Sequence, residues 1–241
     1  MLLRRKIVGL IVLLSCFNAK AQLNGSSFSP QMDPADSLAN NFYISHRGSA
    51  LSLYNGRLFH GYGGYKGNGY YAFSDWAVGS IQYDGIWYDS VKLIYDIYAD
   101  DIIVRSLNND PVILFKDRVQ KFTLQGLQFI RLQADKDGVI RTGFYQVLAL
   151  GKLTIIARRT KLVDEKIEDG MAIREFRATN RFYAYKDGVY HSFNKQKKLL
   201  ALVRESKSSI QQQLRKEGIR WKTNRELVMS RIANIYNQTS R

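Results

Sequence analysis

The sequence predicts an α+β protein: a predominantly antiparallel β-sheet, arranged as a meander, a sandwich or a barrel-like assembly, with a C-terminal tail of two to three helices. Short runs of β-branched and aromatic residues recur between residues 42 and 194, and turn signals such as Asp-Gly separate them. After Asn194 this alternation stops and helix-forming residues take over. We therefore expect an antiparallel β domain over residues 42–194 and a basic helical tail over residues 195–241, packed on the sheet.

Residues 1–21 read as an export signal, with a basic start, the apolar run 7–14 and a small-residue cleavage site before Gln22. The apolar run is about half of the roughly 20 residues that a membrane-spanning helix needs. We therefore expect no transmembrane span and a mature chain that begins at Gln22. In an alternative interpretation, Leu13-Leu14-Ser15-Cys16 resembles a bacterial lipoprotein box, and Cys16 is the lipidation site. Both interpretations predict an exported protein, in the periplasm or associated with the outer membrane.

Residues 22–41 contain few large apolar side chains and two of the three prolines, which is typical of a flexible leader. Cys16 is the only cysteine. A chain cut before Gln22 therefore has no disulfide and no thiolate zinc site, and its core alone must hold the fold.

The first predicted hairpins turn at Asn55-Gly56 and Asp84-Gly85, and a further corner falls at Ala99–Asp101. Strands are then expected over residues 111–115, 118–124, 127–132, 143–150 and 152–159. Residues 162–171 read as a charged loop. The last hairpin, residues 173–185 and 189–194, reverses at Asp187-Gly188.

Helices are predicted over residues 194–205 and 206–218, with Gly218 as the C-terminal cap of the second. In the last helix Thr223 and Glu226 have the spacing of a capping box. Apolar residues then follow at i, i+4, i+7 and i+8, a stripe expected to dock on the sheet: Val228, Ile232, Ile235 and Tyr236.

The net charge of +15 is concentrated towards the C-terminus: after Asn194 the chain has 12 basic and 3 acidic residues. Basic helices attract polyanions such as lipid headgroups and acidic glycans. Export makes nucleic acid the least favoured partner, so anionic envelope components or another envelope protein are expected. The candidate ligand-binding residues of the tail are Lys207, Arg215, Lys216, Arg220, Lys222 and Arg225.

Tyrosines are frequent between Gly61 and Val104, and most of those in the later part alternate as sheet packing requires. Four aromatic residues instead lie in a Gly-rich segment that reads as a surface loop, and they are candidates for stacking on sugar rings: Tyr65, Tyr70, Tyr71 and Trp76. The acids of this region fall mainly in turns. Asp96 is predicted to lie mid-strand, with Lys92 or Arg105 as its partner.

Catalytic and metal chemistry find no support in the sequence. The three histidines, His46, His60 and His191, are far apart, and no nucleophile elbow, phosphate-binding loop or zincin motif occurs. We therefore predict no cofactor and no enzymatic activity.

Several segments resemble a family of exported cell-envelope proteins of Bacteroidota. They are Gly69-Tyr70-Tyr71, Asp75-Trp76, Gly79 to Gly85, Val91 to Asp96, Asp100 to Ile103 and Gly143 to Leu153. The resemblance implies an envelope location and a β-sheet with helices, and it supplies no catalytic residue. The resulting hypothesis is a non-catalytic binding or scaffolding role. The alternatives are a polyanion or glycan binder that uses the basic helices and the Gly/Tyr-rich loop, and a hydrolase whose site is assembled from residues distant in sequence.

Overall fold

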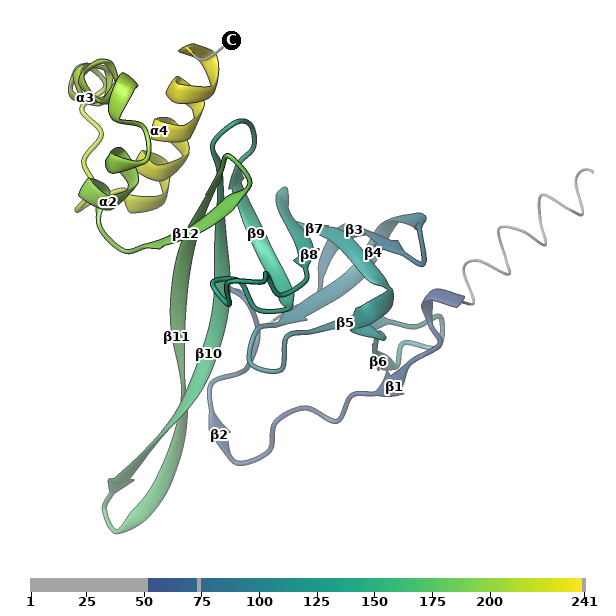
Figure 1. Cartoon of the computed structure of the whole chain (residues 1–241). Coiled ribbons are helices and arrows are strands. Elements are labelled where there is room, and N and C mark those ends of the chain that lie inside the picture. The colour runs from purple at the N-terminus through teal and green to yellow at the C-terminus, as the bar shows by residue number, and fades with distance from the viewer. Residues whose placement is uncertain (1–51, 73–74, 240–241) are drawn as a thin grey trace, which may run out of the picture. The chain divides into compact units, whose positions relative to one another are not determined.

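The computed structural model describes residues 52–72 and 75–239, all of which belong to one unit, Tyr43–Arg241 (Figure 1). The predicted export signal, the leader and Cys16 lie outside the described residues. The predicted fold class is confirmed: twelve strands form one mostly antiparallel sheet, and three helices follow it. Its strand order is β1-β6-β5-β4-β3-β7-β8-β9-β10-β11-β12, an open path from β1 to β12, and the short β2 pairs with β11 in parallel.

The first six strands are β1 (Arg57–Leu58), β2 (Tyr65–Lys66), β3 (Ala77–Tyr83), β4 (Ile86–Asp96), β5 (Asp101–Arg105) and β6 (Pro111–Ile113). The next six are β7 (Val119–Leu124), β8 (Leu127–Leu132), β9 (Gly143–Ala149), β10 (Thr154–Glu168), β11 (Met171–Lys186) and β12 (Val189–Phe193). The helices are α2 (Gln196–Ala201), α3 (Lys207–Lys216) and α4 (Arg225–Thr239), with 3-10 turns at Lys116–Arg118 and Arg204–Ser206.

The predicted Asp-Gly turns are confirmed. Asp84 and Gly85 join β3 to β4 with φ angles of 51° and 80°, and Asp187 and Gly188 join β11 to β12 with 51° and 83°. Paired positive φ angles give the two-residue turn whose twist matches that of the flanking strands.

The hairpin predicted at Asn55-Gly56 is wrong. Ser52 and Leu53 are helical, and β1 pairs with β6 instead of with the preceding residues. Gly56 is required for a different reason, because a Cβ atom there would come within 2.1 Å of the carbonyl oxygen of Ile113. The glycine permits close approach of two backbones.

The charged loop predicted over residues 162–171 is also wrong. These residues extend β10 and β11 into one long hairpin, paired from Thr154 with Tyr185 to Glu168 with Met171 and closed by Asp169-Gly170 (Figure 1). Ion pairs cross between its strands, from Arg177 to Asp164 and from Lys166 to Glu175. The charges belong to a solvated two-stranded ribbon, so the lack of an apolar face did not prevent strand formation.

Strands β3 to β9 surround an aromatic core. Phe122 and Phe129 stack with ring centroids 4.7 Å apart, and Tyr95 meets both rings edge-on. The hydroxyl of Tyr95 donates to Asp100 in the β4–β5 turn, so this phenol ties the core to the turn.

The three helices cover one face of β9–β12. Ile155 and Phe182 from the sheet share a buried cluster with Ile232 of α4 and Ile210 of α3. The predicted α4 stripe is confirmed, because Val228, Ile232, Ile235 and Tyr236 are all buried.

The predicted capping box is wrong. Helix α4 begins at Arg225 and the carbonyl of Asn224 accepts the N–H of Val228, while the hydroxyl of Thr223 donates back to Arg220. The Glu226 carboxylate binds Arg159 of β10 instead of the helix N-terminus. Glu226 therefore forms an ion pair with a distant strand in place of the local contact that a capping box requires.

The loop between β8 and β9 covers part of the opposite face of β10–β11, at the base of the hairpin. Ile140 of this loop packs in a buried cluster with Tyr145, Ile156 and Tyr183. The hydroxyl of Tyr145 donates to the carbonyl of Arg141, which fixes the loop against the sheet.

Candidate functional site

The predicted aromatic residues have mostly structural partners. Tyr65 stacks on Phe176 at 5.2 Å, and Trp76 lies beneath the guanidinium of Arg105 at 4.7 Å. The Tyr71 hydroxyl donates to Gln146, and burial raises the pKa of this phenol. Tyr70 and Tyr71 do share a cavity of about 600 Å³, which Asn68, Arg159, Lys161 and Glu226 also line.

The acids of the β4–β5 region hold the turn together. Asp96 accepts the N–H groups of Tyr98 and Ala99 and the hydroxyl of Tyr62, and burial raises its pKa. The prediction that Lys92 or Arg105 pairs with Asp96 is wrong, because these backbone and phenol groups take the available oxygens.

The adjacent acids bind one other strand and one 3-10 turn. Asp100 lies 3.7 Å from Arg158, and Asp101 lies 2.7 Å from Lys116. Each carboxylate of this turn is therefore engaged in joining one element to the next.

The predicted basic residues of the tail do not form a single site. Arg215, Arg220 and Lys222 border a hollow of about 390 Å³ beside Trp221, whereas Lys207 and Lys216 are exposed on α3. Arg225 belongs to a different place.

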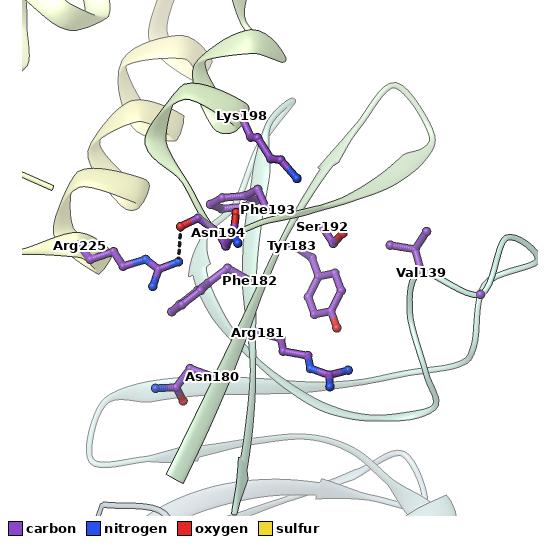
Figure 2. A pocket seen from close by; sticks show the side chains of 11 residues that line it. Val139, Asn180, Arg181, Phe182, Tyr183, Ser192, Phe193, Asn194, Lys198 and Arg225 are labelled. Atoms are coloured by element: carbon purple, nitrogen blue, oxygen red, sulfur yellow. Dashed lines mark hydrogen bonds between the residues drawn. The ribbon is translucent and has the colours of Figure 1, made fainter. Parts of the chain in front are cut away.

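The guanidinium of Arg225 lies over the rings of Phe182 and Trp221, at 4.8 and 5.3 Å, and donates to the carbonyl of Asn194 at 2.7 Å. This residue therefore joins α4 to the end of β12. It also lines a cavity along β11 (Figure 2).

That cavity, of about 420 Å³, adjoins a second one of about 340 Å³; we call the two together the basic groove. Gly138, Val139, Arg181 and Tyr183 line both parts. No Asp or Glu is among the described residues that line the basic groove. Six of its lining residues are basic: Arg141, Arg158, Lys161, Arg181, Lys198 and Arg225.

Two of these cations directly oppose each other. Arg158 of β10 is the register partner of Arg181 of β11, so their side chains emerge on the same face. Like charges placed directly opposite are destabilising. Arg158 is partly compensated by Asp100 and lies 3.3 Å from the Tyr145 hydroxyl.

Arg181 is exposed, and among the described residues no carboxylate lies within ion-pair distance of it. Figure 2 shows its side chain directed away from β11 beside Tyr183. An anion bound between Arg181 and its basic neighbours would relieve their repulsion, and a guanidinium is well suited to bind a carboxylate or phosphate in a bidentate manner.

The sequence contained a signal for this groove that was missed. Counting outward from the turn Asp169-Gly170 places Arg158 opposite Arg181. This count is valid only if the charged residues between them form the two strands of one hairpin, and the sequence predicted a loop there. The contribution of Arg141 depends on the fold of the β8–β9 loop and has no local signal.

The chain matches no family model, no curated protein and no solved structure. Within residues 52–72 and 75–239, no helix has the length and apolar character needed to cross a bilayer. No cluster of three potential metal-ligating side chains occurs in the same part of the chain.

Proposed function

We propose that this protein is an exported, non-catalytic binding protein of the cell envelope, and that its basic groove holds the anionic groups of a partner. The observation that carries the proposal is a groove with six basic and no acidic lining residues, in which Arg158 and Arg181 oppose each other. Export is inferred from residues 1–21. The sequence predicted an anion site on the basic helices, whereas the present proposal places it on the sheet. Arg225 belongs to both sets of residues.

The chemistry of the groove favours an extended partner with several anionic groups. Its cations lie along two adjoining cavities, and amide and hydroxyl groups from Asn180, Ser192 and Asn194 line the larger of the two. Spaced charges and neutral hydrogen-bonding groups suit a chain of carboxylates or phosphates.

The test compares two variants that remove the same amount of charge. Arg141→Ala/Arg181→Ala/Lys198→Ala removes three exposed cations of the groove, whereas Lys207→Ala/Arg215→Ala/Lys216→Ala removes three exposed cations of α3. Binding of oligogalacturonate and of vesicles containing phosphatidylglycerol is measured at low and high salt. We expect the groove variant to lose about tenfold or more in affinity, a change of roughly 1.4 kcal/mol, and the wild-type affinity to fall with salt.

Equal affinity of the groove variant and the wild type for both probes would contradict the proposal. A loss confined to the α3 variant would move the site to the helical tail.

A further inference from the structure

The outer edge of β11 carries an open segment. Strand β10 occupies the inner edge along the whole hairpin. On the outer edge β12 pairs with residues from Phe182 to Lys186, and β2 pairs with Arg174 and Glu175. Between them, no described strand pairs with the outer edge of the six residues from Phe176 to Arg181. We call this six-residue segment the β11 gap.

The space beside the β11 gap is open. The cavity that contains Arg181 and Arg225 lies at its β12 end, and the cavity of about 600 Å³ that contains Ala178 lies further along. Asn180 lines both of these cavities, and Ala178, Asn180 and Arg181 are exposed. An extended chain therefore has access to this edge without displacing a strand.

The surroundings of the β11 gap are positively charged. Arg181, Lys198 and Arg225 line the cavity at one end, and Lys161 lines the cavity at the other. Glu226 is the acidic residue lining the cavity of about 600 Å³. Its carboxylate is bound by Arg159 through two hydrogen bonds of 2.7 Å.

We infer that the β11 gap binds an extended acidic segment of a partner protein, which adds a strand between β12 and β2. The inference rests on the proposed function, because it names the partner class of the same basic region. A sheet edge offers N–H and C=O groups that an extended peptide satisfies, while pockets on either side read alternate side chains. A gap of six residues spans about 20 Å at 3.3 Å per residue, the length of a short strand.

The two faces of the added strand would meet different surroundings. Arg181 and Asn180 point to opposite sides of β11 (Figure 2). Arg181 shares its face with Arg158 and, four residues along the strand, Arg177. Because side chains alternate along a strand, acidic residues are expected at every second position of the partner segment.

The test uses three acetylated, amidated hexapeptides of equal charge. The first alternates Asp and Val, the second places its three Asp residues consecutively, and the third repeats the first with N-methyl groups on alternate amides. N-methylation removes backbone donors and keeps the charge. Affinity for the full chain is measured by fluorescence anisotropy, and amide NMR shifts locate the bound peptide. We expect the alternating peptide to bind about tenfold more tightly than either control, with the largest shifts at Phe176–Arg181.

Protein variants provide a second readout. Arg181→Ala should weaken binding of the alternating peptide, whereas Arg220→Ala, an exposed cation outside the β11 gap, should not.

The outcomes separate the inference from the proposed function. Tight binding of oligogalacturonate with no binding of the alternating peptide would leave the anion groove standing and overturn strand addition. Equal binding of the methylated and unmethylated peptides would show charge attraction alone and would also overturn it. Dimerisation of the free chain with shifts at Phe176–Arg181 would assign the edge to a second copy. Failure of every anionic probe would contradict both proposals.

Discussion

The β10–β11 hairpin has two regions with the same backbone pairing and different surroundings. At its base Ile155, Ala157 and Phe182 are buried beneath the helices. In its distal arm Ile167 is 79% exposed and Met171 is 66% exposed. Cross-strand pairing is continuous through both regions. Burial therefore distinguishes the base from the solvated arm, whereas the ladder of backbone hydrogen bonds does not. We expect the base to be the more stable region, and four changes test this.

The largest effect is expected from one substitution made in each region. Ile155 and Ile167 lie on the same face of β10, since their positions differ by an even number, and Ile155 is fully buried. Ile155→Ala should lower the free energy of unfolding by about 2–5 kcal/mol, whereas Ile167→Ala should stay within about 0.5 kcal/mol of wild type. Urea denaturation measures both. Similar losses for the two variants would contradict the comparison.

The second effect is expected from the ion pair that joins the base to α4. Arg159 is 5% exposed, and its guanidinium is held by Glu226 and Gln146. Glu226→Gln keeps the side-chain shape and leaves the buried cation without its counter-charge, so we expect a loss of about 1–3 kcal/mol.

The control for Glu226→Gln is Glu217→Gln. Glu217 pairs with Arg231 on the helical surface, where ion pairs contribute little, so its loss should be the smaller one. Replacing Arg159 and Glu226 together by Met and Leu should recover most of the stability lost in Glu226→Gln.

The sequence predicted the parts of this hairpin whose signals are local. Asp187-Gly188 marks its turn into β12 by residue type alone, and the stripe of α4 that covers the base follows from helical spacing. The distal arm was missed because residues 162–171 lack an apolar face, and ion pairs between residues 9 and 13 apart in the chain support the strands instead. Strand pairing itself creates those neighbours.

The candidate site was less predictable than the fold. Tyr62 reaches Asp96 from 34 residues away, and Arg159 reaches Glu226 from 67 residues away, so neither partnership has a signal in either segment alone. The six basic residues of the groove come from two strands, one loop and two helices. Their convergence depends on the tertiary fold, whereas the charge of the tail is visible from composition.

The third effect concerns the boundary between base and arm, where Lys161 N–H donates to the carbonyl of Ile97. Burial raises the pKa of the neighbouring Asp96 above its ordinary value of 3.8. The folded state therefore binds the carboxyl proton of Asp96 more tightly than the unfolded state does, which stabilises the folded state at low pH. Above pH 3.8 this stabilisation decreases, and it is lost as the pH rises through the raised pKa of folded Asp96.

Asp96→Asn removes that titration. An Asn oxygen still accepts the N–H groups of Tyr98 and Ala99, so the turn should persist. We expect the free energy of unfolding of wild type, relative to Asp96→Asn, to decline as the pH rises above about 4. Urea titrations of both proteins at several pH values above and below about 4 measure the difference. A relative stability of wild type that rises with pH would be inconsistent with a buried carboxyl group whose pKa is raised.

The smallest effect is expected in the distal arm. Asp164 accepts a hydrogen bond of 2.5 Å from Arg177 across the hairpin, and this contact lowers the pKa of its carboxyl group. The pair is solvated, so Asp164→Asn should leave the global unfolding transition unchanged. It should instead accelerate amide exchange of residues 162–177, because few buried contacts oppose local opening of this region. The base, from Thr154 to Arg159, should exchange as in wild type. A matching acceleration at the base would show that arm and base open as one unit, and the distinction between the two regions would then be one of exposure without a difference in local stability.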